Sequence, residues 1–215
     1  MFSMRDLAVC AAVSLALTAC SAPPEKKAPV AAQPELPKIA PDVFRVTLAT
    51  SKGDIVIEAH KDWAPAGVEQ FYSLARSGFF DGARFYRVVR DYVAQWGIAA
   101  DPETNKLWAS AVIPDDAVKH SNVRGAVSFA AAGPHTRTTQ LFINLEDHKN
   151  LDEQGFAPIG EVVSGMDVAD RLYFLYGDIP PRGAGPDPAK MAAQGNDYLM
   201  ESFPRLDYIK KATIQ

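Results

Sequence analysis

RFYRVVRDYVAQWG, residues 84–97, reads as two short strands on either side of a turn. Successive side chains of a strand point to opposite faces, so Phe85, Arg87 and Val89 are expected on one face. A guanidinium between apolar neighbours on a half-buried face is costly unless a partner holds it. Taken alone, Arg87 fits either a structural ion pair or a functional residue, and its surroundings must decide between them.

Strand signals recur on both sides of this stretch. Two alternating runs around the turn at 51–54 predict a β-hairpin over residues 44–60. Many short strands with closely spaced turns are typical of a β-barrel or a β-sandwich, and the pattern alone leaves both open. The further strands are expected at 84–90, 93–97, 125–130, 140–145, 156–163 and 206–214.

Helices are predicted at few places. Apolar residues at helical spacing over 68–75 predict a helix that begins near Pro65 and stops at Gly78. A second helix is expected over 166–173, and a short one near 189–200. Strands therefore dominate the predicted fold.

Composition excludes several function classes. The 215 residues are 47% hydrophobic and 22% charged, as in an ordinary soluble domain. A formal net charge of −4 gives no basis for binding nucleic acid. The four histidines lack metal-ligand spacing, and Ser128 lacks the glycine-flanked turn of a hydrolase nucleophile. We therefore expect no metal and no cofactor.

The first 20 residues have the layout of a secretory signal. Arg5 precedes an apolar run over 7–17, which is short for a transmembrane helix. The sequence LTAC, ending at Cys20, resembles the bacterial lipobox, whose cysteine is lipidated and becomes the first residue. An uncleaved N-terminal anchor is the alternative. The only other cysteine, Cys10, leaves with the signal, so we expect no disulfide in the exported domain.

The rest of the chain divides into a tether and one domain. Residues 21–41 hold six of the sixteen prolines and no aromatic residue, which predicts a flexible, extended tether. Residues 42–215 form the domain, with an insertion near 177–200. We interpret residues 178–190 as a solvent-exposed loop, with a partner surface as the alternative. Ser21 after the lipidated cysteine favours the outer membrane of a Gram-negative envelope.

Six segments together resemble the cyclophilins, a family of peptidyl-prolyl cis–trans isomerases. Their order and spacing match the family's two main signatures and extend to its later turns. The segments are FYRVV (85–89), YVAQWG (92–97), RGAVSFAAAGP (124–134), TQLFI (139–143), NLD (150–152) and GEVVSGM (160–166).

The resemblance implies a fold and an activity. It implies a closed, eight-stranded antiparallel β-barrel capped by two α-helices, acting as a monomer on proline-containing polypeptides without a cofactor. It makes Arg87 and Gln95 catalytic, with Arg87 donating to the proline nitrogen as the peptide bond twists. The substrate-binding residues that it implies are Tyr86, Tyr92, Val93, Ala130, Ala131, Ala132, Gln140, Phe142 and Leu151.

Several positions depart from the family pattern. Tyr86 replaces a histidine, Tyr92 and Val93 replace a phenylalanine and a methionine, and Ala131 replaces an asparagine. Trp96 replaces a glycine, and both Tyr86 and Trp96 fit either the pocket rim or plain packing. These changes keep open a second hypothesis, a proline-peptide binding module or holdase with little turnover. The main hypothesis is an isomerase that acts on exported proteins at the cell envelope, held to the membrane by a lipid on Cys20.

Overall fold

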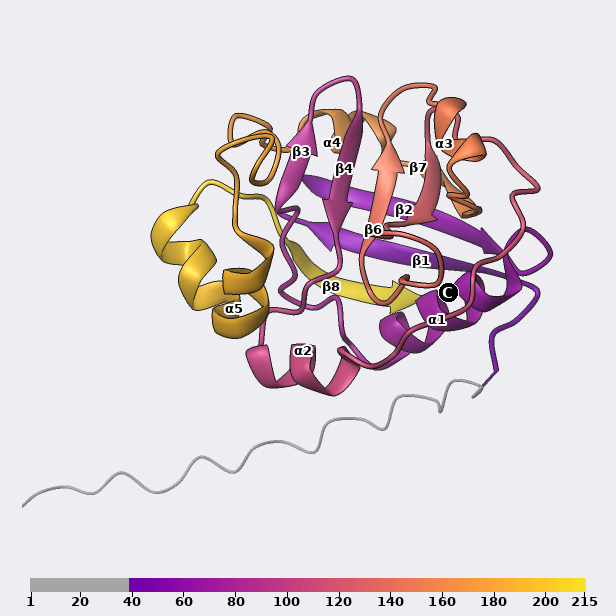
Figure 1. Cartoon of the computed structure of the whole chain (residues 1–215), viewed down its shortest axis with the longest axis horizontal. Coiled ribbons are helices and arrows are strands. Elements are labelled where there is room, and N and C mark those ends of the chain that lie inside the picture. The colour runs from indigo at the N-terminus through magenta and orange to yellow at the C-terminus, as the bar shows by residue number, and fades with distance from the viewer. Residues whose placement is uncertain (1–38) are drawn as a thin grey trace, which may run out of the picture. The chain divides into compact units, whose positions relative to one another are not determined.

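The computed structural model describes residues 39–215 (Figure 1). The predicted signal segment, the lipidated Cys20 and nearly all of the tether lie outside the described residues and stay predictions. Within residues 39–215, no helix is long and apolar enough to cross a membrane.

In the part of the chain that the structure describes, eight antiparallel strands form a single sheet in the order β3-β4-β6-β5-β7-β2-β1-β8. All of them lie where strands were predicted, including the hairpin of β1 and β2. The strands are β1 (Val43–Thr50), β2 (Gly53–His60), β3 (Arg87–Val89), β4 (Val93–Trp96), β5 (Ala126–Phe129), β6 (Leu141–Asn144), β7 (Pro158–Ser164) and β8 (Ile209–Ile214).

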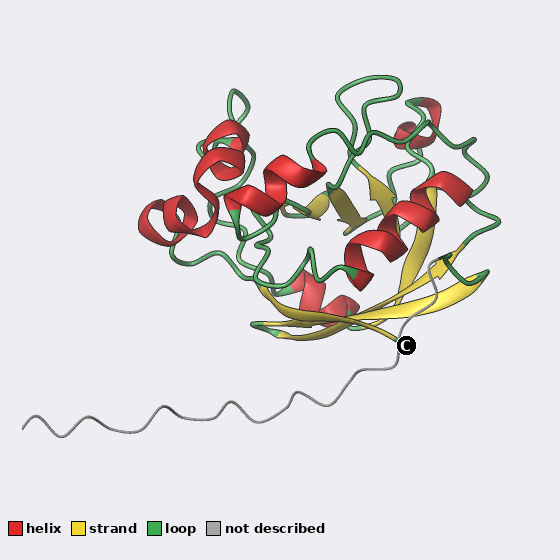
Figure 2. Ribbon diagram, turned by 90° about the horizontal axis from the view of Figure 1, so that it is seen from below, coloured by secondary structure: helices red, strands yellow, loops and turns green. Residues whose placement is uncertain are grey.

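The sheet curls strongly but does not close, so the expectation of a closed barrel was wrong (Figure 2). Its two edge strands, β3 and β8, share no ladder. Near them the chain makes one isolated bridge, Arg84 to Tyr208, and a backbone hydrogen bond from Phe85 N to Asp207 O of 3.0 Å. The residues that approach β8 precede β3, since Gly82 N donates to Ile209 O and Ile209 N donates to Ala83 O, both at 2.8 Å, and β3 itself begins only at Arg87.

Among residues 39–215, five helical segments accompany the sheet, not the two implied by the resemblance. Three lie close to predicted positions, and α4 is shorter than predicted because the Tyr173 amide, beyond its end, donates to Asp207 instead. The other two, α2 and α3, were not predicted. The helices are α1 (Pro65–Arg76), α2 (Pro102–Trp108), α3 (Asn150–Glu153), α4 (Met166–Asp170) and α5 (Pro188–Ser202).

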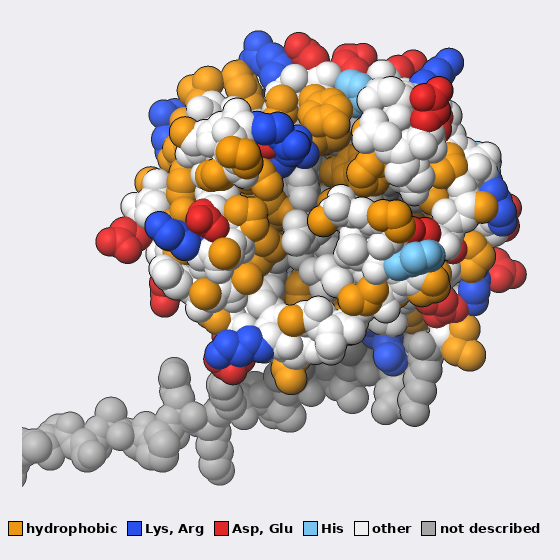
Figure 3. Space-filling view, viewed as in Figure 1, with side chains coloured by type: hydrophobic (Ala, Val, Ile, Leu, Met, Phe, Trp, Pro, Cys, Tyr) orange, Lys and Arg blue, Asp and Glu red, His pale blue; other side chains and the backbone are white. Residues whose placement is uncertain are grey.

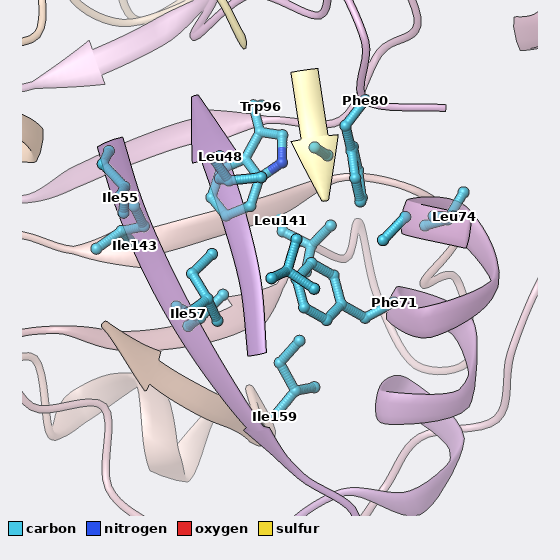
Figure 4. Close-up of a cluster of buried hydrophobic side chains, with 14 of the residues drawn as sticks. Leu48, Ile55, Ile57, Phe71, Leu74, Phe80, Trp96, Leu141, Ile143 and Ile159 are labelled. Atoms are coloured by element: carbon cyan, nitrogen blue, oxygen red, sulfur yellow. The ribbon is translucent and has the colours of Figure 1, made fainter. Parts of the chain in front are cut away.

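The main core fills the concave side of the sheet under α1 (Figure 4). Trp96 belongs to this core: it is fully buried and packs near Phe80 and Phe85. Of its two proposed roles, the structure therefore favours plain packing. Other core residues are Leu48, Ile55, Ile57, Phe71, Leu74, Leu141, Ile143 and Ile159.

A second, smaller core joins α5 to the strand region. Met191 and Leu199 of α5 are buried against Tyr86, in a cluster that also holds Ile98 and Leu206. The insertion near 177–200 is therefore fastened to the domain by its own apolar contacts.

Candidate active site

The ladder of β3, β4 and β6 sorts side chains between two faces. Arg87 pairs with Gln95, and Gln95 pairs with Phe142. Directly opposed residues share a face, so these three form a row on the convex side. The alternate residues Val88 and Ala94 point into the core. One strand register therefore sets both the core and the candidate site.

The predicted alternation was wrong for Phe85. This side chain is buried in the main core with Val88, on the side opposite Arg87. Regular alternation begins only at Arg87, the first residue of β3, because residues 84–86 make no continuous ladder. The apolar surroundings of Arg87 are instead those of a cavity on the convex face.

This cavity has a volume of about 750 Å³ and opens on the face shown in Figure 3. Its lining includes every predicted site residue except Tyr86: Arg87, Tyr92, Val93, Gln95, Ala130, Ala131, Ala132, Gln140, Phe142 and Leu151. Seven further residues line the cavity without having been predicted from the sequence: Thr136, Thr138, Gln154, Phe156, Asp178, Ile179 and Arg182.

The floor of the cavity is apolar. Val93, Phe142 and Leu151 form a small buried cluster, with Tyr92 and Ala130 packed at its border. Phe156 completes the floor, edge-on to Phe142 at 5.7 Å between ring centroids. A concave apolar surface of this kind suits a proline ring. Phe156 was not among the substrate-binding residues that the resemblance implied.

Arg87 lies at the edge of this floor with 9% of its surface exposed. Its Nη1 donates to Gln95 Oε1 at 3.1 Å, and its guanidinium carbon lies 5.5 Å from the centre of the Tyr92 ring. The distance to the ring is compatible with a cation–π contact. A permanently charged donor is thus fixed beside an apolar recess.

Tyr86 lies behind the cavity rather than in its wall. Its hydroxyl accepts a hydrogen bond from Gln95 Nε2 at 2.7 Å and donates to Gln140 Oε1 at 2.5 Å. The residue is 1% exposed, and burial raises the pKa of its hydroxyl, which stays neutral. Gln95 also donates to Gln140 Oε1 at 3.2 Å. Tyr86 therefore supports both glutamines from behind and does not touch the cavity.

The most important residue missed from the sequence is Asp178. Its Oδ1 accepts from Arg87 Nε at 2.6 Å, and its Oδ2 accepts from Arg87 Nη2 at 3.3 Å and from Arg182 Nε at 3.0 Å. Burial acts to raise the pKa of Asp178, but the hydrogen bonds from the two arginines outweigh it and lower the pKa to about 2. The interpretation of residues 178–190 as merely a solvent-exposed loop is corrected here, since this segment reaches Arg87.

The family description "cyclophilin type peptidyl-prolyl cis-trans isomerase" matches residues 45–178, more than half of the chain. The chain belongs to this family. It is 36% identical to peptidyl-prolyl cis-trans isomerase ppi1 of Schizosaccharomyces pombe, over 66% of this chain and 92% of that protein. It is 34% identical to peptidyl-prolyl cis-trans isomerase B of Escherichia coli, over 59% of this chain and 82% of that protein.

Solved cyclophilin structures show the same fold. A cyclophilin-type isomerase of Cryptosporidium parvum superposes with a TM-score of 0.56 at 19% identity, covering 80% of this chain and 98% of that one. Cyclophilin AquaCyp293 of Hirschia baltica gives a TM-score of 0.57 at 18% identity, covering 81% of this chain and 74% of that one. The Cryptosporidium protein was also solved in the presence of the dipeptide Ala-Pro.

Proposed function

We propose that this cyclophilin catalyses cis–trans isomerisation of X–Pro bonds in exported proteins, and that a lipid on Cys20 holds it at the envelope membrane. The observation that carries the catalytic part is Arg87, a buried guanidinium fixed by Gln95 at the edge of an apolar recess. The export part is supported by the signal-like pattern of residues 1–20.

The chemistry needs only what this cavity offers. Amide resonance imposes a barrier of about 18–20 kcal/mol on rotation of the peptide bond. As the bond twists, resonance is lost and the proline nitrogen becomes a hydrogen-bond acceptor. A fixed cationic donor binds that twisted state better than either planar state, which lowers the barrier. Arg87 supplies the donor, and the floor around Phe142 holds the proline ring.

The two glutamines extend the polar side of the cavity. Gln140 Oε1 already accepts bonds from Tyr86 and Gln95, so its amide NH₂ is the group available to a peptide backbone. The Ala130–Ala132 segment directly follows β5, lies beside Gln140 through a hydrogen bond of 2.9 Å from Ala130 N to Gln140 O, and lines the cavity. Its small side chains leave room for the residues that precede proline.

NMR exchange spectroscopy on a proline tetrapeptide tests the catalytic part, with the full chain and with Arg87→Ala and Arg87→Lys variants. We expect fast exchange with the wild type and a loss of about 100-fold with Arg87→Ala. Lysine keeps the charge but lacks the planar fork that Gln95 and Asp178 hold, so Arg87→Lys should also lose most activity. Arg76→Ala, at the exposed end of α1, should leave exchange unchanged. Peptide binding without faster exchange would overturn this part.

Metabolic labelling with a radioactive fatty acid tests the anchoring part. In a bacterial host, the wild type should incorporate the label and sediment with membranes. Cys20→Ser should lose both properties, whereas Cys10→Ser should keep both. Equal labelling of the two variants, or a Cys20→Ser variant that stays with the membrane, would contradict the lipid anchor.

A further inference from the structure

The segment over 177–187 extends the active-site face beyond the edge of β3. Gly177 makes an isolated antiparallel bridge with Val88, so this segment lies directly alongside the strand that carries Arg87. It brings Asp178, Ile179 and Arg182 to the cavity. The family match ends at residue 178, so most of this segment lies beyond the matched part of the chain.

The Asp178 carboxylate is itself held in place. Besides the bonds from Arg87 and Arg182, its Oδ1 accepts from the Ile179 amide at 2.8 Å. The segment also folds back over its backbone, because Gly185 N donates to the Asp178 carbonyl at 2.9 Å. A Cβ atom on Gly183 would lie 2.2 Å from the same carbonyl, so the approach requires glycine there. Asp178 is thus presented to Arg87 by a tightly turned backbone.

Helix α5 fastens this segment to the domain from behind. Ile179 packs at the border of the second core, whose centre is formed by Met191, Leu199 and Tyr86. In the same helix Asn196 donates from its backbone amide to Ala100 O at 2.9 Å. The segment that carries Asp178 is therefore packed against the same small core as Tyr86. Tyr86 in turn orients Gln95 and Gln140 through its hydroxyl.

We propose that Asp178 is a positioning residue for Arg87, fixing the plane of the guanidinium for catalysis; this inference rests on the proposed isomerase function. A guanidinium has five N–H donors. Asp178 engages the Nε edge and Gln95 engages Nη1, so the group is held from two sides and cannot turn about its last bonds. Two N–H groups, one on each Nη, remain for the substrate.

The ion pair between Asp178 and Arg87 neither neutralises the cavity nor covers its apolar floor. Asp178 is shared between two arginines, so the three groups together keep one net positive charge. Asp178 approaches Arg87 from the β3 edge, opposite the Ala130–Ala132 end, and is not part of the apolar floor. A preoriented donor costs no reorganisation when the peptide bond twists. A freely rotating one misses the proline nitrogen in many encounters.

The test compares Asp178→Ala and Asp178→Asn with Asp167→Asn in the full-length protein. Asp167 is a matched control because it makes the same i,i+4 pair with an arginine, Arg171, but is 73% exposed and lies outside the cavity. NMR exchange at several peptide concentrations separates kcat from KM. A second readout is solvent exchange of the Arg87 Nε proton, followed in 15N spectra.

We expect Asp178→Ala to lower kcat about tenfold with KM within twofold, and to speed solvent exchange of the Arg87 Nε proton. Asp178→Asn keeps the shape and one acceptor, so its loss should be smaller, and it carries the test if the alanine variant does not fold. Asp167→Asn should match the wild type. An unchanged or higher kcat in both Asp178 variants would overturn the proposal. It would mean that holding the Arg87 guanidinium does not assist catalysis.

Failure of the proposed function itself would look different. The wild type would then bind peptide without faster exchange, while the Arg87 Nε proton would still report whether Asp178 holds the guanidinium. Slow solvent exchange of that proton in both Asp178 variants, as in the wild type, would overturn the positioning role whatever the activity.

Discussion

The Tyr86 hydroxyl connects the two glutamines of the active site, accepting from Gln95 at 2.7 Å and donating to Gln140 at 2.5 Å. Where the family pattern has a histidine, this chain thus places a buried tyrosine behind the cavity wall. The relationship ties the orientation of both glutamines to one side chain that a substrate does not reach.

Tyr86→Phe removes this link without changing the packing volume much. We expect an unfolding free energy lower by about 1–2 kcal/mol, because Gln95 and Gln140 lose a buried partner. We also expect peptide exchange to slow about threefold to tenfold as the glutamines and Arg87 loosen. Urea unfolding and NMR exchange measure the two effects.

Tyr72→Phe is the matched control for this prediction. Tyr72 is equally buried, but its hydroxyl has no hydrogen-bond partner in residues 39–215. Its removal should leave stability unchanged or slightly higher and activity unchanged. If both variants lose the same stability, the Tyr86 hydrogen bonds contribute nothing beyond the shape of the ring.

Gly97→Ala should destabilise the junction between β4 and the segment before β6. Gly97 has φ +106°, and a Cβ there would lie 2.2 Å from the Thr139 carbonyl oxygen. Both the backbone conformation and the contact oppose a side chain, so we expect a loss of at least about 2 kcal/mol in unfolding free energy. Gly133→Ala, where nothing lies within 4 Å of the added Cβ, should change stability little. Similar losses of unfolding free energy in the two variants would show that the contact with the Thr139 carbonyl does not determine the cost at Gly97.

Leu199→Ala should weaken the second core. Leu199 is 4% exposed and packs in the cluster of Tyr86, whereas its neighbour Met200 is 52% exposed. We expect the leucine truncation to cost about 2–4 kcal/mol and to increase hydrogen exchange over 177–203. Met200→Ala should cost less than about 0.5 kcal/mol. A Leu199→Ala variant with unchanged protection over 177–203 would mean that α5 is not what holds this segment.

The environment of Asp152 predicts that the protein loses stability in acid. Burial acts to raise its pKa, but hydrogen bonds from Ser121 and Asn122 outweigh it, so the folded-state pKa lies below the ordinary value. Its contribution to stability is therefore present above the unfolded-state pKa of about 3.9 and is lost as pH falls through the lower folded-state pKa. Asp152 follows Leu151 of the cavity floor in α3.

Asp152→Asn should lower the free energy of unfolding at pH 7 and flatten its fall as the pH drops below about 4. Urea unfolding of wild type and variant over that range measures both effects. Parallel curves for the two proteins would assign the acid sensitivity to other groups, of which Asp178 is the first to examine.

Local sequence patterns predicted most of the sheet and the apolar half of the site. β-Hairpin turns, alternation and the cyclophilin-like segments placed all eight strands and ten residues of the cavity lining. Helix α2 also carries a local signal that we did not use: Asp101 before Pro102 is an N-cap followed by a first-turn proline. The position of each strand is therefore predictable from its own residues and the turns beside it.

Long-range pairings were not predictable in this way. Arg87 and Asp178 are 91 residues apart, and the Pro/Gly-rich composition around Asp178 is typical of an exposed loop. Closure of the barrel also depends on where two distant strands end, which the alternation of each strand does not specify. Tyr86 was expected among the substrate-binding residues because it occupies the family's histidine position, and its burial in the second core could not be read from that position. These features depend on tertiary packing.

The two-faced ladder of β3, β4 and β6 has a consequence for how this protein can evolve. Inward positions such as Ala94 and Trp96 are constrained by the main core, whereas outward positions such as Val93 line the cavity and pack only in its small floor cluster. Point substitutions at outward positions can retune which peptides are accepted while the scaffold persists. Loss of a single codon within 93–96 would exchange the two sets of side chains and ruin scaffold and chemistry together. Sequence drift in this region should therefore proceed by replacement and hardly ever by a change in length.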